Sequence, residues 1–130
     1  MPSFSRFLLI CLGGAAGTGA RYLTTVYAAV AFGPSFPAGT LIVNLVGSFL
    51  IGLVMEASRS TSMIGPDLRL VLTTGFLGGF TTYSAFNEES LAMFRSGASR
   101  MALTNISATL VGCLIAGMAG MALARALFAR

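Results

Sequence analysis

The sequence predicts an all-α integral membrane protein with four transmembrane helices, the third of them broken within the membrane. Hydrophobic residues make up 55% of the 130 residues and charged residues only 9%, whereas a soluble domain carries about 25% charge. Residues 22–55, 70–87 and 101–124 contain no charged residue. Because a helix needs about 20 residues to cross the hydrocarbon core, these stretches and the apolar N-terminus suffice for four crossings in one domain, residues 1–130.

The first helix is expected over about residues 5–31. Arg6 followed by an apolar run and small residues also resembles a secretory signal peptide. The apolar character continues to Val30 without a stop, which favours a transmembrane helix. Gly13 and Gly17 lie one turn apart, and small residues at that spacing let a neighbouring helix approach closely.

The second helix is expected over about residues 38–58. Gly33, Pro34 and Pro37 precede it, and a glycine with two prolines ends the first helix in a turn. A short polar loop follows over residues 59–66.

The third helix is expected over about residues 67–94, with a break around Gly78–Thr82. Asp67 suits a helix N-terminus, where the macrodipole favours negative charge. Glycines at 75, 78 and 79 weaken the helix that follows, because each costs about 1 kcal/mol relative to alanine. A break at membrane depth is tolerated only where it is buried in protein or lines a polar path.

The fourth helix is expected over about residues 100–127, after a turn at residues 96–99. Small residues recur on it at every fourth position: Ala108, Gly112, Ala116, Gly120 and Ala124. Such a stripe brings helix backbones together. Four short helices enclose little interior, so we expect a pathway to need a second copy of the chain, that is, a homodimer.

Eight arginines and no lysine give a net charge of +4. They are scattered singly among apolar runs, which favours contact with lipid headgroups over nucleic acid. If the N-terminus is cytoplasmic, five lie on that side and two on the other: Arg6, Arg59, Arg69, Arg125 and Arg130 against Arg95 and Arg100. This modest bias leaves the orientation open.

A metal enzyme is not indicated, because the chain has no histidine and its four acids are dispersed. Cys11 and Cys113 both fall within expected helices, so we interpret them as small buried apolar residues rather than a disulfide or metal pair. No nucleophile–base pair is visible, and no organic cofactor is expected.

The break in the third helix is the first candidate site. It could be a packing kink that lets another helix approach. The functional alternative is an ion site built from freed backbone carbonyls, which suit a hard monovalent cation. A phosphate-binding loop is excluded, because no lysine follows the glycines and no strand precedes them.

Polar side chains within the helices form the second candidate site. Thr40 and Asn44 share one face of the second helix, and Asn105, Thr109 and Cys113 share one face of the fourth. Any one of them could simply hydrogen-bond between helices. Two such stripes resemble a lined track for an anion, whose donors would be N–H and O–H groups. Thr82 and Ser84 extend this track beyond the break.

Arg21 has no acid at helical spacing. It could snorkel to the interface, but an intramembrane cation at the mouth of an anion path is the functional alternative.

Tyr83 and Phe86 follow the break at a spacing that points both into one conduit, where electropositive ring edges face an anion, although membrane phenylalanines usually face lipid or core. One of the acids Glu88 and Glu89 could face a water-filled vestibule or solvent.

Three motifs together resemble the Fluc/CrcB family of fluoride channels over nearly the whole chain. They are Gly-Thr-Leu-Ile-Val-Asn at 39–44, Gly-Phe-Leu-Gly-Gly-Phe-Thr-Thr-Tyr-Ser-Ala-Phe at 75–86, and the glycine-rich first helix ending in Ala-Arg-Tyr at 20–22. The resemblance implies antiparallel, dual-topology homodimers in the bacterial inner membrane. Each dimer would hold two pores and export fluoride that accumulates in the cell.

The resemblance also implies roles for individual residues. A structural sodium ion at the dimer interface would rest on the backbone carbonyls of Gly78 and Thr81 from both subunits. Arg21 and Glu89 would belong to a vestibule. The positions matched to the fluoride path are Asn44, Tyr83, Phe86, Asn105, Thr109 and Cys113.

The chain departs from the family pattern at four positions. Tyr83 replaces the usual phenylalanine, and its hydroxyl could donate to fluoride or bind water in its place. Ala85 replaces a hydroxyl residue between the aromatics. Asn105 and Cys113 replace a more typical tyrosine and serine on the fourth helix, which bears on the details of the track and on the conduction rate.

Two other classes of protein are alternatives. A small cation or multidrug antiporter is also a four-helix dimer, but it needs an acid in the first helix, and residues 7–20 contain none. A non-transporting scaffold protein would not need clustered donors beside a helix break. Replacement of Asn44 should leave such a scaffold unaffected.

Overall fold

A computed structural model describes residues 3–128 of the chain, and every element in that range is helical. The prediction of an all-α protein is therefore confirmed. Three helices, α1, α2 and α6, are long and apolar enough to cross a membrane. The elements are α1 (Phe4–Phe32), α2 (Ala38–Ser60), α3 (Pro66–Leu70), the π-helix η1 (Val71–Leu77), α4 (Gly78–Phe80), α5 (Tyr83–Arg95) and α6 (Ser99–Phe128).

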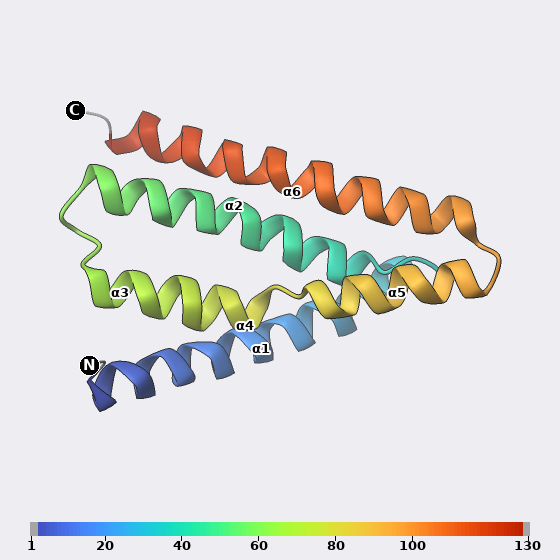
Figure 1. Ribbon diagram of the computed structural model, residues 1–130, viewed down its shortest axis with the longest axis horizontal. Helices are drawn as coiled ribbons and strands as arrows, with labels where there is room; N and C mark the ends of the chain where they lie inside the picture. Colours follow the sequence, from blue (N-terminus) through green and yellow to red (C-terminus); the bar gives the residue numbers. More distant parts are fainter. Residues whose placement is uncertain (1–2, 129–130) are drawn as a thin grey trace.

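The helices run along one common direction, with α2 beside α6 and the α3–α5 segment between α2 and α1 (Figure 1). The most extensive packing joins α2 to α6 and α1 to η1. The start of α1, the end of α6 and the α2–α3 loop lie at one end of the bundle, here called the N-terminal end. The α1–α2 and α5–α6 turns lie at the opposite end, here called the far end.

The helix ends differ little from those expected from the sequence. Gly33 stops α1 with a positive φ of 79°, a conformation that glycine adopts without steric cost. α2 continues to Ser60, so the loop before α3 is shorter than expected and covers residues 61–65. Gly97, also at φ 79°, turns the chain between α5 and α6.

The break in the third membrane segment is narrower than expected. The backbone leaves the helix only at Thr81 and Thr82, which are extended at φ −84°, ψ 160° and φ −153°, ψ 119°. The range Gly78–Phe80 stays helical as α4, so the expected break over Gly78–Thr82 is wrong for its first three residues. The π-helix before it, η1, was not expected from the sequence.

Glycines explain why α1 lies so close to the broken segment. A Cβ atom on Gly17 would fall against the Phe76 carbonyl oxygen, and one on Gly79 against the Gly14 carbonyl oxygen, both far inside van der Waals contact. The close approach predicted from Gly13 and Gly17 is therefore present. It is made to η1 and α4, so the glycines that weaken the third helix also let α1 pack on it.

The small-residue stripe of α6 packs in the same way against α2. A Cβ on Gly120 would meet the Phe49 carbonyl oxygen, and Ala124 is fully buried. On the α2 side, a Cβ on Gly52 would meet the Gly117 carbonyl oxygen. The two backbones are therefore in direct contact along this seam.

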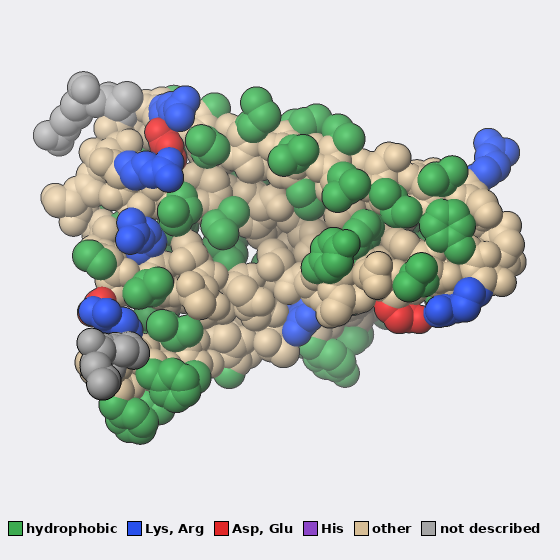
Figure 2. Space-filling model, in the orientation of Figure 1, with side chains coloured by type: hydrophobic (Ala, Val, Ile, Leu, Met, Phe, Trp, Pro, Cys, Tyr) green, Lys and Arg blue, Asp and Glu red, His purple; other side chains and the backbone are tan. Residues whose placement is uncertain are grey.

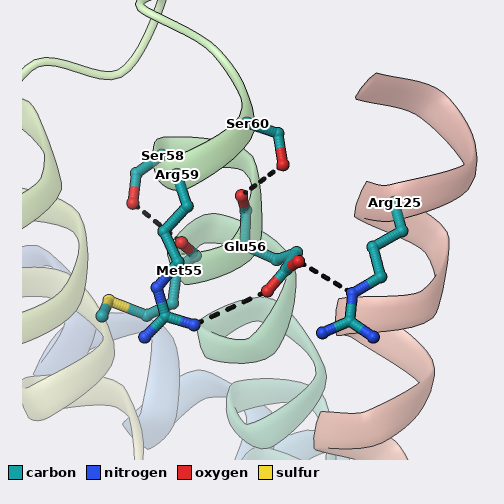
Figure 3. A network of polar contacts seen from close by, with 6 residues as sticks. All are labelled: Met55, Glu56, Ser58, Arg59, Ser60 and Arg125. Carbon is teal, nitrogen blue, oxygen red and sulfur yellow. Dashed lines mark hydrogen bonds and ion pairs between the residues drawn. The ribbon is translucent and has the colours of Figure 1, made fainter. Parts of the chain in front are cut away.

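Ion pairs join helices at the N-terminal end, where Figure 2 shows basic side chains gathered. Glu56 of α2 lies between two arginines (Figure 3): its carboxylate is 2.8 Å from Arg125 Nε on α6 and 3.6 Å from Arg59 Nη1. Arg6 of α1 pairs with Asp67 of α3 at 2.7 Å. The sequence analysis did not predict these pairs. The partners of the Glu56–Arg125 and Arg6–Asp67 pairs are far apart in the chain, whereas Glu56 and Arg59 lie three residues apart on α2.

The two cysteines are not equivalent. Cys11 is exposed on α1, so its expected burial is wrong for the single chain, and Cys113 is half-buried on α6. Both thiols are free. Arg130, part of the arginine bias, lies outside the described residues.

Candidate functional site

The helix break is bridged by the side chain of Asn44. Asn44 Nδ2 donates to the Thr82 carbonyl oxygen at 2.9 Å, and Thr82 N donates back to Asn44 Oδ1 at 2.8 Å. Both residues are buried. The carboxamide thus supplies an acceptor that the Thr82 amide would otherwise lack, and it adds a second donor to the Thr82 carbonyl, which as the N-cap carbonyl also accepts within α5. A buried break in a membrane segment needs such partners for its backbone groups.

This bridge leaves two backbone carbonyls without their helical partners. In a continuous helix, Thr82 N would donate to the Gly78 carbonyl and Ala85 N to the Thr81 carbonyl. Here Thr82 N donates to Asn44, and Ala85 N donates to Thr82 Oγ1 at 3.2 Å. The carbonyls of Gly78 and Thr81 therefore lack the amide donors that a continuous helix would supply.

Side chains at the break also fix how the chain re-enters the helix. Thr82 acts as the N-cap of α5, the position at which threonine satisfies an orphan amide. Its hydroxyl lies 3.3 Å from Ser84 Oγ. Thr81 Oγ1 donates to the Leu77 carbonyl at 2.9 Å. A Cβ on Gly47 would fall against the Thr81 methyl group, so that glycine gives the break room against α2.

Thr40 and Glu89 form a second polar contact between α2 and α5. Thr40 Oγ1 donates to Glu89 Oε1 at 2.6 Å, and Glu89 Oε2 is buried with no hydrogen-bond partner in the described part of the chain. Both residues line a cavity of ≈ 620 Å³ at the far end, which Glu88 also lines. Glu88 and Glu89 therefore both lie at a hollow between α5 and the α1–α2 turn.

The two aromatic residues after the break lie in different environments. The Tyr83 and Phe86 ring centroids are 5.6 Å apart with an interplanar angle of 58°. Phe86 is 6% exposed, whereas Tyr83 is 75% exposed. Tyr83 and Ser84 thus lie on the outside of the single chain, and only Phe86 is enclosed by it.

The polar stripe of α6 faces inward. Asn105 is fully buried, Thr109 is buried and Cys113 is half-buried. Asn105 Nδ2 donates to Ser90 Oγ at 3.0 Å. Within residues 3–128, Asn105 Oδ1 and Thr109 Oγ1 are buried atoms without a hydrogen-bond partner.

Arg21 lies apart from these groups. Its side chain is half-buried on α1 and makes no ion pair with any described residue.

Ser90 is the residue that the sequence analysis missed. Its position one turn after Phe86 was the available signal, but its partner on α6 could not be read from spacing.

The sequence of the chain is similar to that of a known protein family. Residues 8–121 match the model of a family described as "CrcB-like protein, Camphor Resistance (CrcB)". The chain belongs to the CrcB-like family. The resemblance drawn from the motifs at residues 39–44 and 75–86 is confirmed at this level.

Curated relatives of this CrcB-like chain carry the name "Fluoride-specific ion channel FluC". One from Anaeromyxobacter sp. (strain K) is 54% identical over 121 residues, which cover 93% of this chain and 96% of the relative. One from Sorangium cellulosum is 49% identical over 124 residues, covering 95% and 98%. One from Clostridium perfringens (strain 13 / Type A) is 42% identical over 121 residues, covering 93% and 94%. The CrcB-like chain is a multi-pass membrane protein and not an enzyme.

Proposed function

We propose that the chain is a fluoride-specific ion channel that exports fluoride down its electrochemical gradient and so protects the cell from fluoride toxicity. The observation that carries this proposal is identity of up to 54%, over 93% of the chain, to proteins named for that activity. The polar groups around the helix break support the proposal, because they supply hydrogen-bond donors for an anion within the membrane. The bacterial relatives favour the inner membrane as the site of action.

Fluoride is small and strongly hydrated, so a pore must replace its water with hydrogen-bond donors. Asn44 Nδ2 carries two hydrogens, and only one is used by the Thr82 carbonyl. The buried Thr109 hydroxyl has no partner among the described residues and is free to donate. The Tyr83 hydroxyl and the electropositive edge of Phe86 complete the set that we assign to the fluoride path. Thr40, Thr82, Ser84, Asn105 and Cys113 extend it.

The exposure of Tyr83 supports a path completed by a second copy of the chain. A pore residue that is 75% exposed needs a further wall. We propose an antiparallel, dual-topology homodimer with two pores, in which the partner covers this face. Arg21 and the cavity beside Glu89 would form the vestibules, where an unpaired guanidinium attracts the anion.

The backbone carbonyl oxygens at the break fit a sodium ion. The Gly78 and Thr81 carbonyls have lost their helical amide partners, and carbonyl oxygens suit hard monovalent cations. In a dimer, two subunits would supply four such oxygens. A bound sodium would hold the helix breaks of the two subunits together and offset the negative ends of their carbonyl dipoles.

The sodium proposal has its own test. Purified dimer would be transferred from sodium to N-methylglucamine, and thermal unfolding would be followed by size-exclusion chromatography. A lower unfolding temperature that sodium restores, but equimolar choline does not, is expected. Identical unfolding in all three cations would contradict a structural sodium site.

Fluoride export is tested in a bacterial strain that lacks its own fluoride exporter. Expression of this chain should restore growth on fluoride medium and lower intracellular fluoride, measured by electrode after lysis. The Asn44→Ala variant, present in the membrane in equal amount, should not. Normal membrane levels of the wild-type chain without restored growth would contradict the proposed function.

A further inference from the structure

We propose that Asn105 is a positioning residue for Phe86 and acts on it through Ser90. The proposal rests on the proposed function, in which Phe86 lines the fluoride path. It assigns Asn105 a second task beside any contact with the ion, namely to fix the α5 half-helix on α6.

Three buried residues form a relay from α6 to Phe86. Asn105, which is 0% exposed, donates from Nδ2 to Ser90 Oγ at 3.0 Å. Ser90, which is 5% exposed, donates from Oγ to the Phe86 carbonyl oxygen at 2.7 Å. A serine hydroxyl carries one hydrogen, so the oxygen that donates to Phe86 must accept from Asn105. This direction requires the amide nitrogen, not the amide oxygen, to face Ser90.

The relay holds one side of Phe86 while the helix break holds the other. Thr82 lies four residues before Phe86 and is held by Asn44 of α2. Ser90 lies four residues after Phe86 and is held by Asn105 of α6. Positions four apart share one helix face, so two asparagines from two helices fix the α5 face that carries Phe86.

Apart from this relay, α5 has one side-chain hydrogen bond to another helix within the described residues, from Thr40 of α2 to Glu89. Among the described residues, the Asn105–Ser90 contact is the one side-chain hydrogen bond between α5 and α6. α5 is also separated from the preceding helix by the extended residues Thr81 and Thr82. A short half-helix after a break can rotate or slide unless it is anchored, and such a shift would move the Phe86 ring relative to the path.

The unpaired oxygen of Asn105 argues against a residue kept only for packing. Oδ1 is buried without a partner within residues 3–128, and an unsatisfied buried polar atom destabilises the fold. A leucine of similar size would fill the same space without that oxygen. The Asn105 amide therefore lowers the stability of the fold, while its nitrogen fixes the position of α5 relative to α6.

The test uses near-isosteric and conservative variants in proteoliposomes. Asn105→Leu and Ser90→Ala should each slow fluoride efflux about tenfold, since small displacements of a positioned group have effects of this order or larger. The double variant should be no slower than Asn105→Leu alone. Ser90→Thr keeps the hydroxyl and should retain most of the rate. The control Ser107→Ala, at an exposed position of α6, should also retain it.

Two readouts separate positioning from a general loss of structure. In a Phe86→Leu background, Ser90→Ala should cause no further loss, because Ser90 is not assigned to the fluoride path and its effect passes through the ring. In the wild-type background, 4-fluorophenylalanine at position 86 should shift or broaden its ¹⁹F resonance when Asn105 or Ser90 is replaced. Additive losses with Phe86→Leu, or an unmoved resonance, would overturn the proposal.

Failure of the proposed function would look different. If the wild-type dimer does not conduct fluoride, the ¹⁹F measurement still decides whether the relay fixes Phe86. If Asn105→Leu does not yield a dimer, Ser90→Ala, which removes only a hydroxyl, gives the same two readouts.

Discussion

The Asn44 side chain and the Thr82 peptide groups exchange two hydrogen bonds, of 2.9 and 2.8 Å, across the interruption in the third membrane segment. This exchange satisfies Thr82 and diverts its amide from the Gly78 carbonyl. The same contact therefore stabilises the break, removes the amide donor of the Gly78 carbonyl, and leaves an amide nitrogen with one unused hydrogen at the break. Asn44 couples the architecture of the break to the chemistry proposed for it.

Replacement of Asn44 should damage both stability and conduction. Asn44→Ala leaves the Thr82 amide without an acceptor and removes one of the two donors to the Thr82 carbonyl, and a buried unpaired group costs about 1–3 kcal/mol. We expect a lower thermal unfolding temperature in detergent and fluoride efflux reduced to background. Ser48→Ala, one turn later on α2, is the matched control and should behave like the wild-type chain. An Asn44→Ala protein that conducts normally would contradict this account of the break.

The contact between α1 and η1 should tolerate no side chain at Gly17. A Cβ there would meet the Phe76 carbonyl oxygen, and overpacking of this kind costs about 1–3 kcal/mol. Gly17→Ala should therefore lower the unfolding temperature of the dimer. Gly19→Ala is the matched control, because a Cβ at Gly19 meets nothing within 4 Å. Equal stability of the two variants would show that the helices are less closely packed than described.

The hydroxyl of Tyr83 should affect conduction and not folding. Tyr83→Phe removes one donor from a ring that is largely exposed in the single chain. If this hydroxyl helps to replace the hydration shell of fluoride, efflux should slow several-fold while the dimer elutes unchanged. Tyr22→Phe, at another exposed tyrosine on α1, should leave the rate unaltered. An unchanged rate in Tyr83→Phe would remove this hydroxyl from the path.

The Glu56 ion pairs should stabilise the seam between α2 and α6 in a salt-dependent way. Glu56 is only 12% exposed, while Arg59 and Arg125 are largely exposed. Glu56→Gln should lower the unfolding temperature at low salt, and the difference from wild type should shrink near about 1 M salt, where charges are screened within about 3 Å. Glu88→Gln is the control, because its ion pair with Arg95 stays within α5. A difference in unfolding temperature that does not change with salt would indicate that Glu56 acts through packing and not through its charge.

The positions of the membrane helices could be predicted from the sequence because lipid imposes a simple rule. Charges cannot enter the hydrocarbon core cheaply, so the uncharged stretches mark the crossings. The glycines before Thr81 likewise predicted an irregular third helix, since glycine weakens helices wherever they occur. These effects depend on local sequence alone.

Contacts between helices could not be predicted in the same way. Gly79 packs against Gly14 of α1 so closely that a side chain would not fit, and the sequence of the third helix contains no sign of that partner. Nothing in the local sequence explains the π-helix over Val71–Leu77. Asn105 was grouped with Thr109 by spacing, but its bond to Ser90 depends on how α5 sits on α6.

The measurement that tests the central claim most directly is ion efflux from liposomes that contain the purified wild-type dimer. Vesicles loaded with both anions would be diluted into anion-free medium with a potassium ionophore, and fluoride and chloride electrodes would record the same sample. The account predicts rapid loss of fluoride while chloride is retained until detergent is added. Retention of both anions by vesicles with intact dimer, or equal loss of both, would contradict it.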